Sequence, residues 1–506
     1  MSEAGPVELD DVQGLVRFAY KHLTEASFLL LRVNDAAAAR AWLAQAPITT
    51  AAKVDPLPQT ALQVAFTSAG LGALEVAAEL RQGFALEFVA GMASDAARAR
   101  RLGDVGANDA RYWQWGAGER VPHVAVLLYA TAGRLTAWQE EIETQCAAGF
   151  VRIACLPTSD LQGVEPFGFV DGISQPDVDW ERKRPVRDQD QLDYSNSSCL
   201  GEFLLGYPNE YGLYTPRPLI DPRRDRGALL PRAEDDPDQS DLGRNGCYLV
   251  LRQLRQDVAG FWREIDRQAA GDADLRERLA AAMVGRKKNG DALEVLGGGP
   301  GDGGAGTASS ARLDSKPNSQ LNAFTYQADP HGQRCPLGAH IRRANPRNAD
   351  LPPGEPGVLS RLWRTLGFDA AALDEDLVAS TRFHRLLRRG RKYGAVASST
   401  LSATTPNADV GLYFICLAAN ITRQFEFVQS AWLMGSKFAG LTGESDPLLG
   451  HRRPGPGGSP SDAFSIPQAD APDRRLSGLP QFVTVVGGAY FFLPGIRALR
   501  YLATAR

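Results

Sequence analysis

The stretch "SFLLLRVNDAAAARAWLAQA" (Ser27–Ala46) joins a short apolar run to an alanine-rich amphipathic run. The apolar part, Ser27–Val33, has the length of a buried β-strand. Asn34 or Asp35 can cap a helix that starts directly after it. The stretch therefore predicts a strand followed at once by a helix, which is the first step of an α+β fold.

The same alternation continues toward the C-terminus. Thr60–Thr67 and His123–Ala130 are apolar runs of strand length. The run after them places Leu135, Trp138, Ile142 and Cys146 at helical spacing, and "FVRIACLP" then returns to a strand pattern. The order strand, helix, strand, strand, helix, strand is typical of a ferredoxin-like unit, an antiparallel sheet with both helices on one face.

A similar pattern recurs in the second part of the chain. "CYLVLRQL" (Cys247–Leu254) precedes the helical run "QDVAGFWREIDRQA", and "VGLYFICLAA" (Val410–Ala419) precedes "ITRQFEFVQSAWLM". We therefore expect an α+β protein built of two ferredoxin-like halves. We assign residues 1–190 to an N-terminal domain and residues 191–506 to a C-terminal domain.

Two segments that are rich in Gly, Pro and Ser interrupt the second half, near residues 297–312 and 451–465. Such compositions favour surface loops over packed structure. Within the first segment, Gly299–Gly304 fits the G-x-G-x-x-G pattern. No strand precedes it and no apolar helix follows it, so the context of a dinucleotide site is missing.

Composition excludes several classes of protein. The 506 residues include 44% hydrophobic and 23% charged residues, as in ordinary globular proteins, and the net charge of −4 gives no reason to expect nucleic acid or an anionic membrane as partner. The sequence shows no signal peptide and no apolar run of membrane-spanning length, so we expect a cytoplasmic protein. Six scattered cysteines without a C-x-x-C pair disfavour zinc ribbons and iron–sulfur sites, and the lack of C-x-x-C-H disfavours a thioether-bound haem.

Asp171 is an acidic residue in an otherwise apolar or uncharged run, "PFGFVDGISQP" (Pro166–Pro176). A carboxylate in such a run can do acid–base chemistry. By itself, however, an Asp-Gly pair is more often a simple turn.

His340 lies in "CPLGAHIRRANPR", between small apolar residues and a group of arginines. A histidine at such a boundary can offer an imidazole to a buried metal while the arginines bind anionic groups, which is the profile of a haem site. Taken alone, a histidine in this setting is more often a hydrogen-bonded structural residue. Arg388, in "HRLLRRGRKYG", follows two leucines and is the member of this basic run that we expect to face inward.

Together these segments resemble the dye-decolourising peroxidases. Gly168-Phe169-Val170-Asp171-Gly172 matches the GxxDG signature of that family, "AHIRRANPR" is similar to its proximal-histidine segment and "LLRRG" to its distal-arginine segment. The opening "DVQGLVRFAYKHLTEASFLLLRV" and the closing "FVTVVGGAYFFLPGI" are similar to the larger, later-branching members. The resemblance implies a peroxidase with one non-covalent haem b per chain, bound in a cleft of the C-terminal half.

The resemblance also implies roles for individual residues. His340 would be the iron ligand, Asp171 the distal acid–base group, and Arg388 the distal cation, with Arg389 as the alternative. Further residues expected to contact or support the cofactor are Arg347 at a haem propionate, Arg342, Ile173, Gln175, and Glu426 as the carboxylate that accepts the other imidazole N–H. Asn420 and Gln424 are the alternatives to Glu426.

The expected chemistry follows from these roles. Hydrogen peroxide must lose a proton from one oxygen and gain one on the other before its O–O bond breaks, and a single carboxylate can do both. We expect an acidic pH optimum, because Asp171 must be ionised for the first step. The electrons would come from aromatic reductants, and surface Tyr or Trp residues would relay them from molecules too bulky for the pocket. A homo-oligomer is compatible with the sequence.

Three other functions use part of the same residues. A haem-degrading or deferrochelatase-like enzyme has no clear need for the pair Asp171 and Arg388. A non-catalytic haem carrier or sensor needs the histidine and the propionate clamp but not that pair. A haem-free duplicated binding module needs none of these residues, since fold alone does not fix function.

Overall fold

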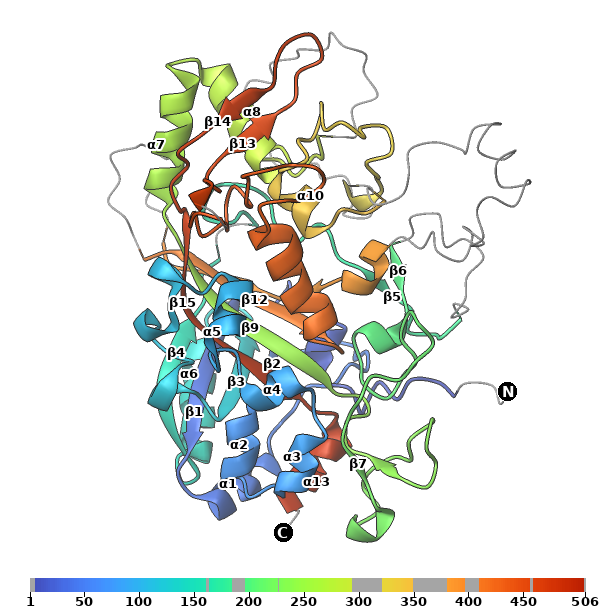
Figure 1. Ribbon diagram of the computed structural model, residues 1–506. Helices are drawn as coiled ribbons and strands as arrows, with labels where there is room; N and C mark the ends of the chain where they lie inside the picture. The colour runs from blue at the N-terminus through green and yellow to red at the C-terminus, as the bar shows by residue number, and fades with distance from the viewer. Residues whose placement is uncertain are drawn as a thin grey trace, which may run out of the picture.

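The computed structural model describes residues 5–160, 163–183, 196–225, 227–293, 321–348, 380–395, 409–455 and 458–504 (Figure 1). Within these residues, a nine-stranded sheet runs through the centre of the molecule in the order β10-β12-β9-β15-β2-β3-β1-β4, with β11 also paired to β12. The molecule is therefore an α+β protein, as the sequence predicts.

The N-terminal half confirms the predicted element order. Its sheet runs β2-β3-β1-β4 with antiparallel pairs. The Asp35 carboxylate caps the first helix by accepting a hydrogen bond from the Ala38 N–H at 2.8 Å. The elements are β1 (Glu25–Val33), α1 (Ala36–Leu43), β2 (Thr60–Phe66), β3 (Val124–Ala130), α6 (Leu135–Cys146) and β4 (Phe150–Pro157).

A group of short helices, which no pattern in the sequence predicts, lies between β2 and β3. Each is too short for a clear helical period, but Thr67 and Asp95 cap two of them with side-chain hydrogen bonds. The elements are α2 (Ser68–Ala73), α3 (Ala78–Gln82), α4 (Leu86–Ala90), α5 (Ala96–Leu102), η2 (Gly106–Asn108), η3 (Ala110–Tyr112) and η4 (Gly118–Arg120).

The C-terminal half repeats the same strand order. Its sheet runs from β10 and β11 through β12 and β9 to β15, again in antiparallel pairs. The predicted helix after β12 is present as two π-helical segments, η8 and η9. The elements are β9 (Cys247–Gln256), α7 (Val258–Ala269), α8 (Ala273–Val284), α10 (His340–Ala344), η7 (Ser380–His384), β10 (Leu387–Arg388), β11 (Arg391–Tyr393), β12 (Gly411–Ala418), η8 (Thr422–Glu426), η9 (Val428–Met434), β13 (Phe464–Ile466), β14 (Arg474–Leu476), β15 (Val483–Leu493) and α13 (Ile496–Thr504).

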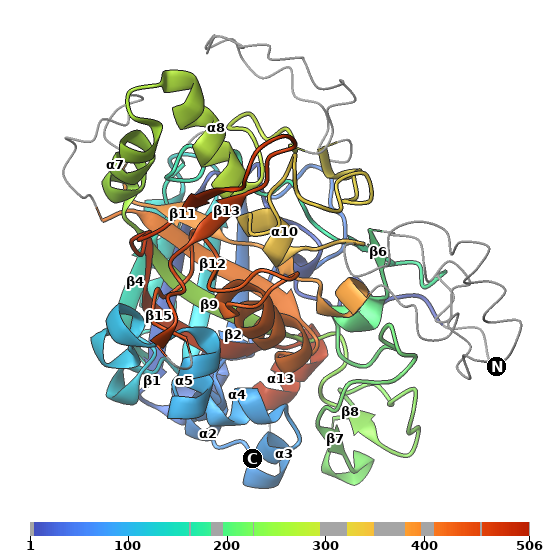
Figure 2. The same ribbon diagram turned by 45° about the horizontal axis from the view of Figure 1, so that its top comes forward.

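The two halves share one sheet because β15 pairs with β2 at Phe492 and Phe66 (Figure 1). One sheet face packs against helices: the core on that face includes Leu43 of α1, Ile142 of α6 and Leu499 of α13. The opposite face is covered by the N-terminal segment and by residues near 200–207. Figure 1 shows α7 and α8 at the far end of the molecule from α1 and α13, and Figure 2 shows them at the end opposite α2 and α3.

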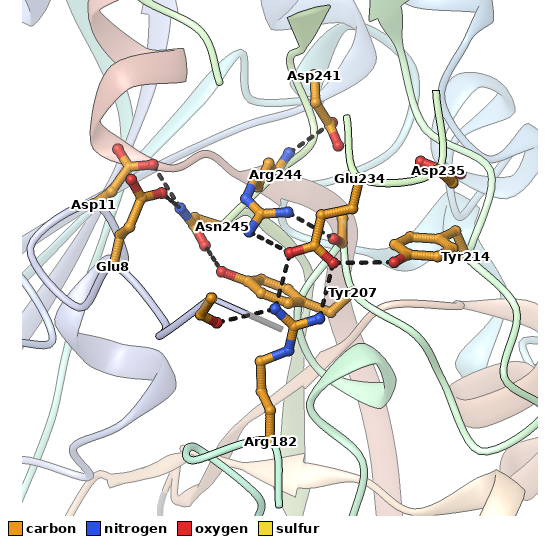
Figure 3. Close-up of polar contacts among 12 residues, drawn as sticks. Glu8, Asp11, Arg182, Tyr207, Tyr214, Glu234, Asp235, Asp241, Arg244 and Asn245 are labelled. Atoms are coloured by element: carbon orange, nitrogen blue, oxygen red, sulfur yellow. Dashed lines mark hydrogen bonds and ion pairs between the residues drawn. The ribbon is translucent and has the colours of Figure 1, made fainter. Parts of the chain in front are cut away.

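The connection between the halves is held by a polar network (Figure 3). The Tyr207 ring lies between the guanidinium groups of Arg182 and Arg244, with their Cζ atoms 5.0 and 4.5 Å from its centroid. Both arginines pair with Glu234 at 2.8 Å, and the Tyr207 hydroxyl donates a hydrogen bond to Asn245. The network fixes the chain shortly after the Asp171 segment. Short elements in and near this connection are η1 (Gly14–Val16), β5 (Asp177–Val178), β6 (Ser197–Ser198), η5 (Leu200–Glu202), β7 (Leu219–Ile220), η6 (Pro222–Arg224) and β8 (Ser240–Asp241).

The described part of the predicted surface loop near residues 451–465 has no strand or α-helix up to residue 460, and the chain becomes buried only at the end of the segment. Phe464 is fully buried and begins β13, which pairs with β14. The Arg452 guanidinium donates hydrogen bonds to the Ser445 hydroxyl and to the Asp446 carbonyl. The contacts of Arg452 and the buried Phe464 thus fasten the two ends of the segment, while residues 458–460 between them are exposed. The other predicted loop, the Gly299–Gly304 pattern and the boundary at residue 190 lie outside the described residues.

Among the described residues, none of the helices combines the length and the apolar character needed to cross a lipid bilayer.

Candidate active site

A cavity of about 290 Å³ lies on the helix-bearing face of the C-terminal half. Asp171, His340 and Arg388 all line it, so the structure brings the three predicted residues to one place. Most of its walls are apolar, including Phe167, Phe169, Leu254, Phe414, Phe425, Val428, Leu433, Leu448 and Leu449.

Asp171 reaches the cavity from a turn between two glycines in the left-handed region, Gly168 with φ of 98° and Gly172 with φ of 77°. The Val170 N–H donates to the Lys288 carbonyl at 3.1 Å, which docks this turn on the C-terminal half. The Asp171 carboxylate accepts hydrogen bonds from the Gly172 N–H at 2.6 Å and from Arg388 Nη1 at 3.3 Å. The turn thus holds the carboxylate beside a fixed cation.

Two opposing effects act on the pKa of Asp171. Burial raises the pKa. The charge of Arg388, the Gly172 N–H and the charge of Lys392 together lower it by more than burial raises it, so the pKa lies below its ordinary value. The side chains of Asp171 and Arg388 keep 39% and 33% exposure, and both line the cavity. Because its pKa lies below the ordinary value, Asp171 is ionised at neutral pH, and its carboxylate is open to a small molecule in the cavity.

Strand alternation decides which arginine faces the cavity. Arg388 lines it from β10, where its Nη2 donates to the Ser174 carbonyl at 3.0 Å and its backbone N–H donates to Gln175 Oε1 at 2.9 Å. Arg389 donates to the carbonyls of Leu15 and Val16 instead. Successive side chains of a strand point to opposite faces of the sheet, so only Arg388 faces the cavity.

His340 is the first residue of α10 and presents its ring to the cavity. Its Nδ1 lies 2.9 Å from Oδ2 of Asp446, whose side chain is fully buried. Burial lowers the pKa of His340, but the Asp446 carboxylate raises it more, so that it lies above its ordinary value. Because Nδ1 is held by Asp446, Nε2 is the nitrogen available to a ligand in the cavity.

Asp446 is itself held in place. Its Oδ1 accepts hydrogen bonds from the N–H groups of Leu448 and Leu449, at 2.9 and 2.8 Å. Burial raises the pKa of Asp446. The positive charge and hydrogen bond of His340 lower it by more than burial raises it, so the pKa lies below its ordinary value. Hydrogen bonds to a charged group contribute roughly 1.5–3 kcal/mol each, enough to fix the orientation of the imidazole.

The prediction that Glu426 accepts the imidazole N–H is therefore wrong. The Glu426 carboxylate is occupied by Arg98 Nε and by the Tyr490 hydroxyl, each at 2.9 Å, on the other side of η8. The alternatives also fail: Gln424 bonds to the carbonyls of Glu202 and Arg385 and to the Asn420 N–H, and Asn420 caps the start of η8 through the Arg423 N–H. A buried acidic residue on a nearby helix therefore does not identify the partner of the imidazole. The charge of Glu426 is balanced by Arg98 of α5, which is far away in the sequence.

Of the arginines expected at the cofactor, Arg347 lines the cavity and Arg342 does not. Arg347 Nη2 donates to Asn322 Oδ1 at 2.6 Å and lies 3.4 Å from the Ser174 hydroxyl. Arg342 has a structural role instead of the expected contact with the cofactor, because its guanidinium donates to the Asp329 carboxylate and to the Cys335 carbonyl. It holds the chain before α10 in place.

Arg286 is a further arginine on the cavity wall, which no local pattern in the sequence indicates. Its Nη2 donates to the same Ser174 hydroxyl at 3.0 Å. Burial and the charge of Arg347 lower its pKa to about 10. Arg286 and Arg347 thus concentrate positive charge at one end of the cavity, where acidic groups of a ligand are stabilised.

The remaining predicted residues also line the cavity. Ile173 is buried, and Gln175 links the Asp171 segment to β10 through its bond to the Arg388 N–H. A second histidine, His384, lines the cavity as well, and its ring stacks on Phe427 at 3.7 Å between centroids. Its Nδ1 faces the Arg423 carbonyl rather than a carboxylate. His340 is therefore the better candidate for a metal ligand.

The sequence contains a weak signal for Asp446. Like Asp171, it is an acidic residue next to an apolar run, "DPLL" (Asp446–Leu449). Nothing in the sequence indicates that the chain brings this residue back to His340.

Comparison with known proteins supports the family resemblance. No model of a protein family matches the chain. It is 28% identical to a multifunctional dye peroxidase from an Amycolatopsis species, over 77% of this chain and 73% of that protein. It is 26% identical to a dye-decolourising peroxidase from Mycetinis scorodonius over 99% and 88% of the two chains, and 27% identical to one from Auricularia auricula-judae over 98% and 87%.

Solved structures agree with these matches. A dye-decolourising peroxidase in complex with 2,6-dimethoxyphenol superposes with a TM-score of 0.70 at 25% identity, covering 98% of this chain and all of that one. A fungal enzyme from Auricularia auricula-judae gives a TM-score of 0.71 at 24% identity, over 99% of this chain and 100% of that one, and so supports the fold.

Fold and relatives together define the class of this protein, which is a peroxidase. It is a homologue of the dye-decolourising peroxidases along nearly its whole length, and the resemblance found in the sequence is confirmed.

Proposed function

We propose that this chain is a haem b peroxidase that binds its cofactor non-covalently in the cavity and reduces hydrogen peroxide at the expense of aromatic reductants. The observation that carries the proposal is the pairing of Asp171 with Arg388 and of His340 with Asp446 around one cavity. A carrier or a haem-degrading enzyme has no use for the first pair.

The residues present fit haem. His340 offers Nε2 while its Nδ1 is held by a carboxylate, the arrangement that makes imidazole a stronger metal ligand. Apolar walls suit a macrocycle, and Arg286 and Arg347 suit its propionates. Bound at His340, haem would supply the iron that takes up peroxide and accepts electrons one at a time.

Asp171 performs the proton transfers in this proposal. As a base it takes the proton from one peroxide oxygen, and as an acid it returns that proton to the other oxygen, which leaves as water. Its lowered pKa keeps it ionised for the first transfer even in mild acid. The surrounding apolar residues keep bulk water from competing for the proton.

Arg388 stabilises the charge that grows on the leaving oxygen. Its guanidinium is already oriented by Asp171 and the Ser174 carbonyl, so it does not reorganise during the reaction. Asp446 acts through His340, because its carboxylate charge beside Nδ1 strengthens electron donation from Nε2 to a metal.

Reductants too large for the cavity need a contact point on the surface. Tyr211 is 53% exposed, and its ring stacks on Phe383 with centroids 4.1 Å apart and planes 8° from parallel. The next residue, His384, lines the cavity. We assign Tyr211 as the exposed end of an electron path into the cavity.

A spectrum before and after peroxide tests the proposal. The purified protein, reconstituted with haem, should show a Soret band that shifts on addition of one equivalent of peroxide and returns when 2,6-dimethoxyphenol is added. The variant His340→Ala should bind haem weakly. A Soret band that peroxide leaves unchanged would point to a carrier, and steady loss of the band with release of iron would point to haem degradation.

A further inference from the structure

A second carboxyl group lines the cavity and has no part in the mechanism above. Glu165 lies at the start of the turn that carries Asp171. Its carboxylate accepts hydrogen bonds from the N–H groups of Phe167 and Phe169, both at 3.0 Å, and from Gln256 Nε2 at 2.9 Å. Glu165 therefore closes the turn through its side chain and fastens it to β9.

The backbone of the same turn is closed by two further bonds. The Glu165 N–H donates to the Phe169 carbonyl, and the Gly168 N–H donates to the Glu165 carbonyl, each at 2.8 Å. The Phe167 ring packs on Phe261 with centroids 4.7 Å apart. The position of Asp171 thus depends on a turn whose polar centre is the Glu165 carboxyl group.

Gln256 is suited to either protonation state of Glu165. It is 5% exposed, and its Oε1 has no hydrogen-bond partner among the described residues. An amide can present either end to a neighbour. Ionised Glu165 accepts from Gln256 Nε2, and neutral Glu165 can donate its proton to Gln256 Oε1 once the amide rotates. A proton can therefore be held between the two side chains without moving the backbone.

Charges nearby make the ionisation of Glu165 matter for Asp171. The charged groups that act on Glu165 are Asp171 on its own segment and Lys392 on β11, and the side chain that β9 places against its carboxylate is the uncharged Gln256. Burial, opposed by the three hydrogen bonds and assisted by the charge of Asp171, raises the pKa of Glu165 to about 7. Near neutral pH the cavity wall therefore gains a second negative charge next to the first.

We propose that Glu165 is a positioning residue for Asp171, and that the proton held between Glu165 and Gln256 sets the upper pH limit of the peroxide-consuming step. With Glu165 neutral, Arg388 faces one carboxylate and can stabilise the leaving oxygen. With Glu165 ionised, a second negative charge opposes the same charge development. The inference rests on the proposed peroxidase function.

The rate of reaction with peroxide, measured by stopped flow from pH 5 to 9, tests the inference. In the wild type we expect a fall above neutrality that approaches tenfold per pH unit, as for loss of one required proton. Glu165→Gln stays uncharged at every pH but loses one of the two accepted N–H groups, because an amide nitrogen cannot accept, so its rate should lie below the wild type at pH 5 and lack the fall above pH 7. An unchanged fall in this variant would overturn the inference.

A second variant should raise the pH above which the rate of reaction with peroxide falls. Gln256→Met removes the amide that stabilises ionised Glu165, so the fall should move to higher pH. Glu75→Gln, which removes a surface carboxylate paired with Arg40, should leave the profile unchanged. A shift to lower pH in Gln256→Met would contradict the role given to the amide.

Thermal unfolding of the haem-free protein gives a readout that does not depend on peroxidase activity. A carboxyl group whose pKa is raised in the folded state stabilises that state below its unfolded pKa, and this stability is lost as pH rises through the folded pKa. The Tm of the wild type should therefore fall more between pH 5 and 8 than the Tm of Glu165→Gln. If peroxide does not react with the wild type at all, the proposed function fails. If it reacts but both profiles and Tm curves coincide, only this inference fails.

Discussion

The two halves of the molecule share one strand order but use the same sheet face differently. Each half contains an arginine paired with a carboxylate: Arg152 with Glu143 in the N-terminal half, at 2.7 Å, and Arg388 with Asp171 at the C-terminal half, at 3.3 Å. The first pair links α6 to β4 on the outside, and the second lines the cavity. Distance alone does not separate a structural pair from a catalytic one, so the surroundings decide.

The surroundings differ because the helix face differs. In β3 every residue is buried and the residues on the helix face are apolar. In the C-terminal half the corresponding face carries Arg252, Gln256 and Arg388 among apolar neighbours, and η8, η9 and α10 stand off far enough to leave a cavity. The N-terminal half thus buries its helix face as hydrophobic core, and the C-terminal half uses the same face to form the candidate active site.

The largest expected effect comes from removing the acid–base group. Asp171→Asn keeps the size of the side chain but cannot take a proton, so the rate of the reaction with peroxide should fall by about 10²–10⁴-fold. Stopped-flow absorbance of the haem protein measures it. Glu143→Gln, the matched change in the N-terminal half, should change the rate less than about twofold, since an exposed pair contributes little. Equal losses in the two variants would remove the distinction between the halves.

The cations of the two pairs should differ in the same way. Arg388→Leu removes the charge that stabilises the leaving oxygen, and the expected loss of rate is on the order of 10²-fold. Arg152→Leu should leave the rate unchanged. Haem content is measured in parallel, because a loss of cofactor in Arg388→Leu would mimic a loss of rate.

The next largest effect is expected from removing the carboxylate charge that supports the imidazole of His340. Asp446→Asn removes the negative charge at His340 Nδ1, and haem affinity should fall by about 10–100-fold, measured as transfer to a haem-scavenging protein. Glu426→Gln alters a buried carboxylate that bonds to Arg98 and Tyr490 instead, so it should lower Tm with little effect on haem affinity. The reverse result would restore Glu426 to the role first predicted for it.

The acid side of the pH profile sharpens the comparison further. The pKa of Asp171 lies below its ordinary value, so its basic form persists in acid and the rate should fall only when pH drops through that lowered pKa. Arg388→Leu removes the charge that lowers it, and the acid limb should then move to higher pH. An acid limb in the same place in both proteins would show that another group controls it.

The smallest effect is expected at the surface. Tyr211→Ser removes the ring that stacks on Phe383, the residue before His384, so turnover of a bulky dye should fall several-fold, while turnover of 2,6-dimethoxyphenol changes less. Tyr112→Ser is the matched control in the N-terminal half, because Tyr112 is 65% exposed and stacks on no aromatic ring among the described residues. Equal losses for the two substrates would indicate a general defect instead of a blocked path.

The sequence allowed the element order and three site residues to be predicted because both depend on local patterns. Strand length, helical spacing and the Asp35 cap are short-range features, and Asp171, His340 and Arg388 each lie in a distinctive segment. The choice between Arg388 and Arg389 required the strand register. Asp446, Arg286 and Glu165 could not be assigned, since their roles arise from contacts between distant segments that no local pattern encodes.

The pairing of β15 with β2 has a consequence for how the protein avoids self-association. Two separate sheets, one of four strands and one of five, would each expose outer strands at both ends, with N–H and C=O groups that can recruit a strand from another molecule. Fusing the sheets at Phe492 and Phe66 leaves only β4 at one end and β10 with β11 at the other, among the described strands. Joining the two halves in one sheet therefore leaves fewer strand edges open to pairing with another molecule.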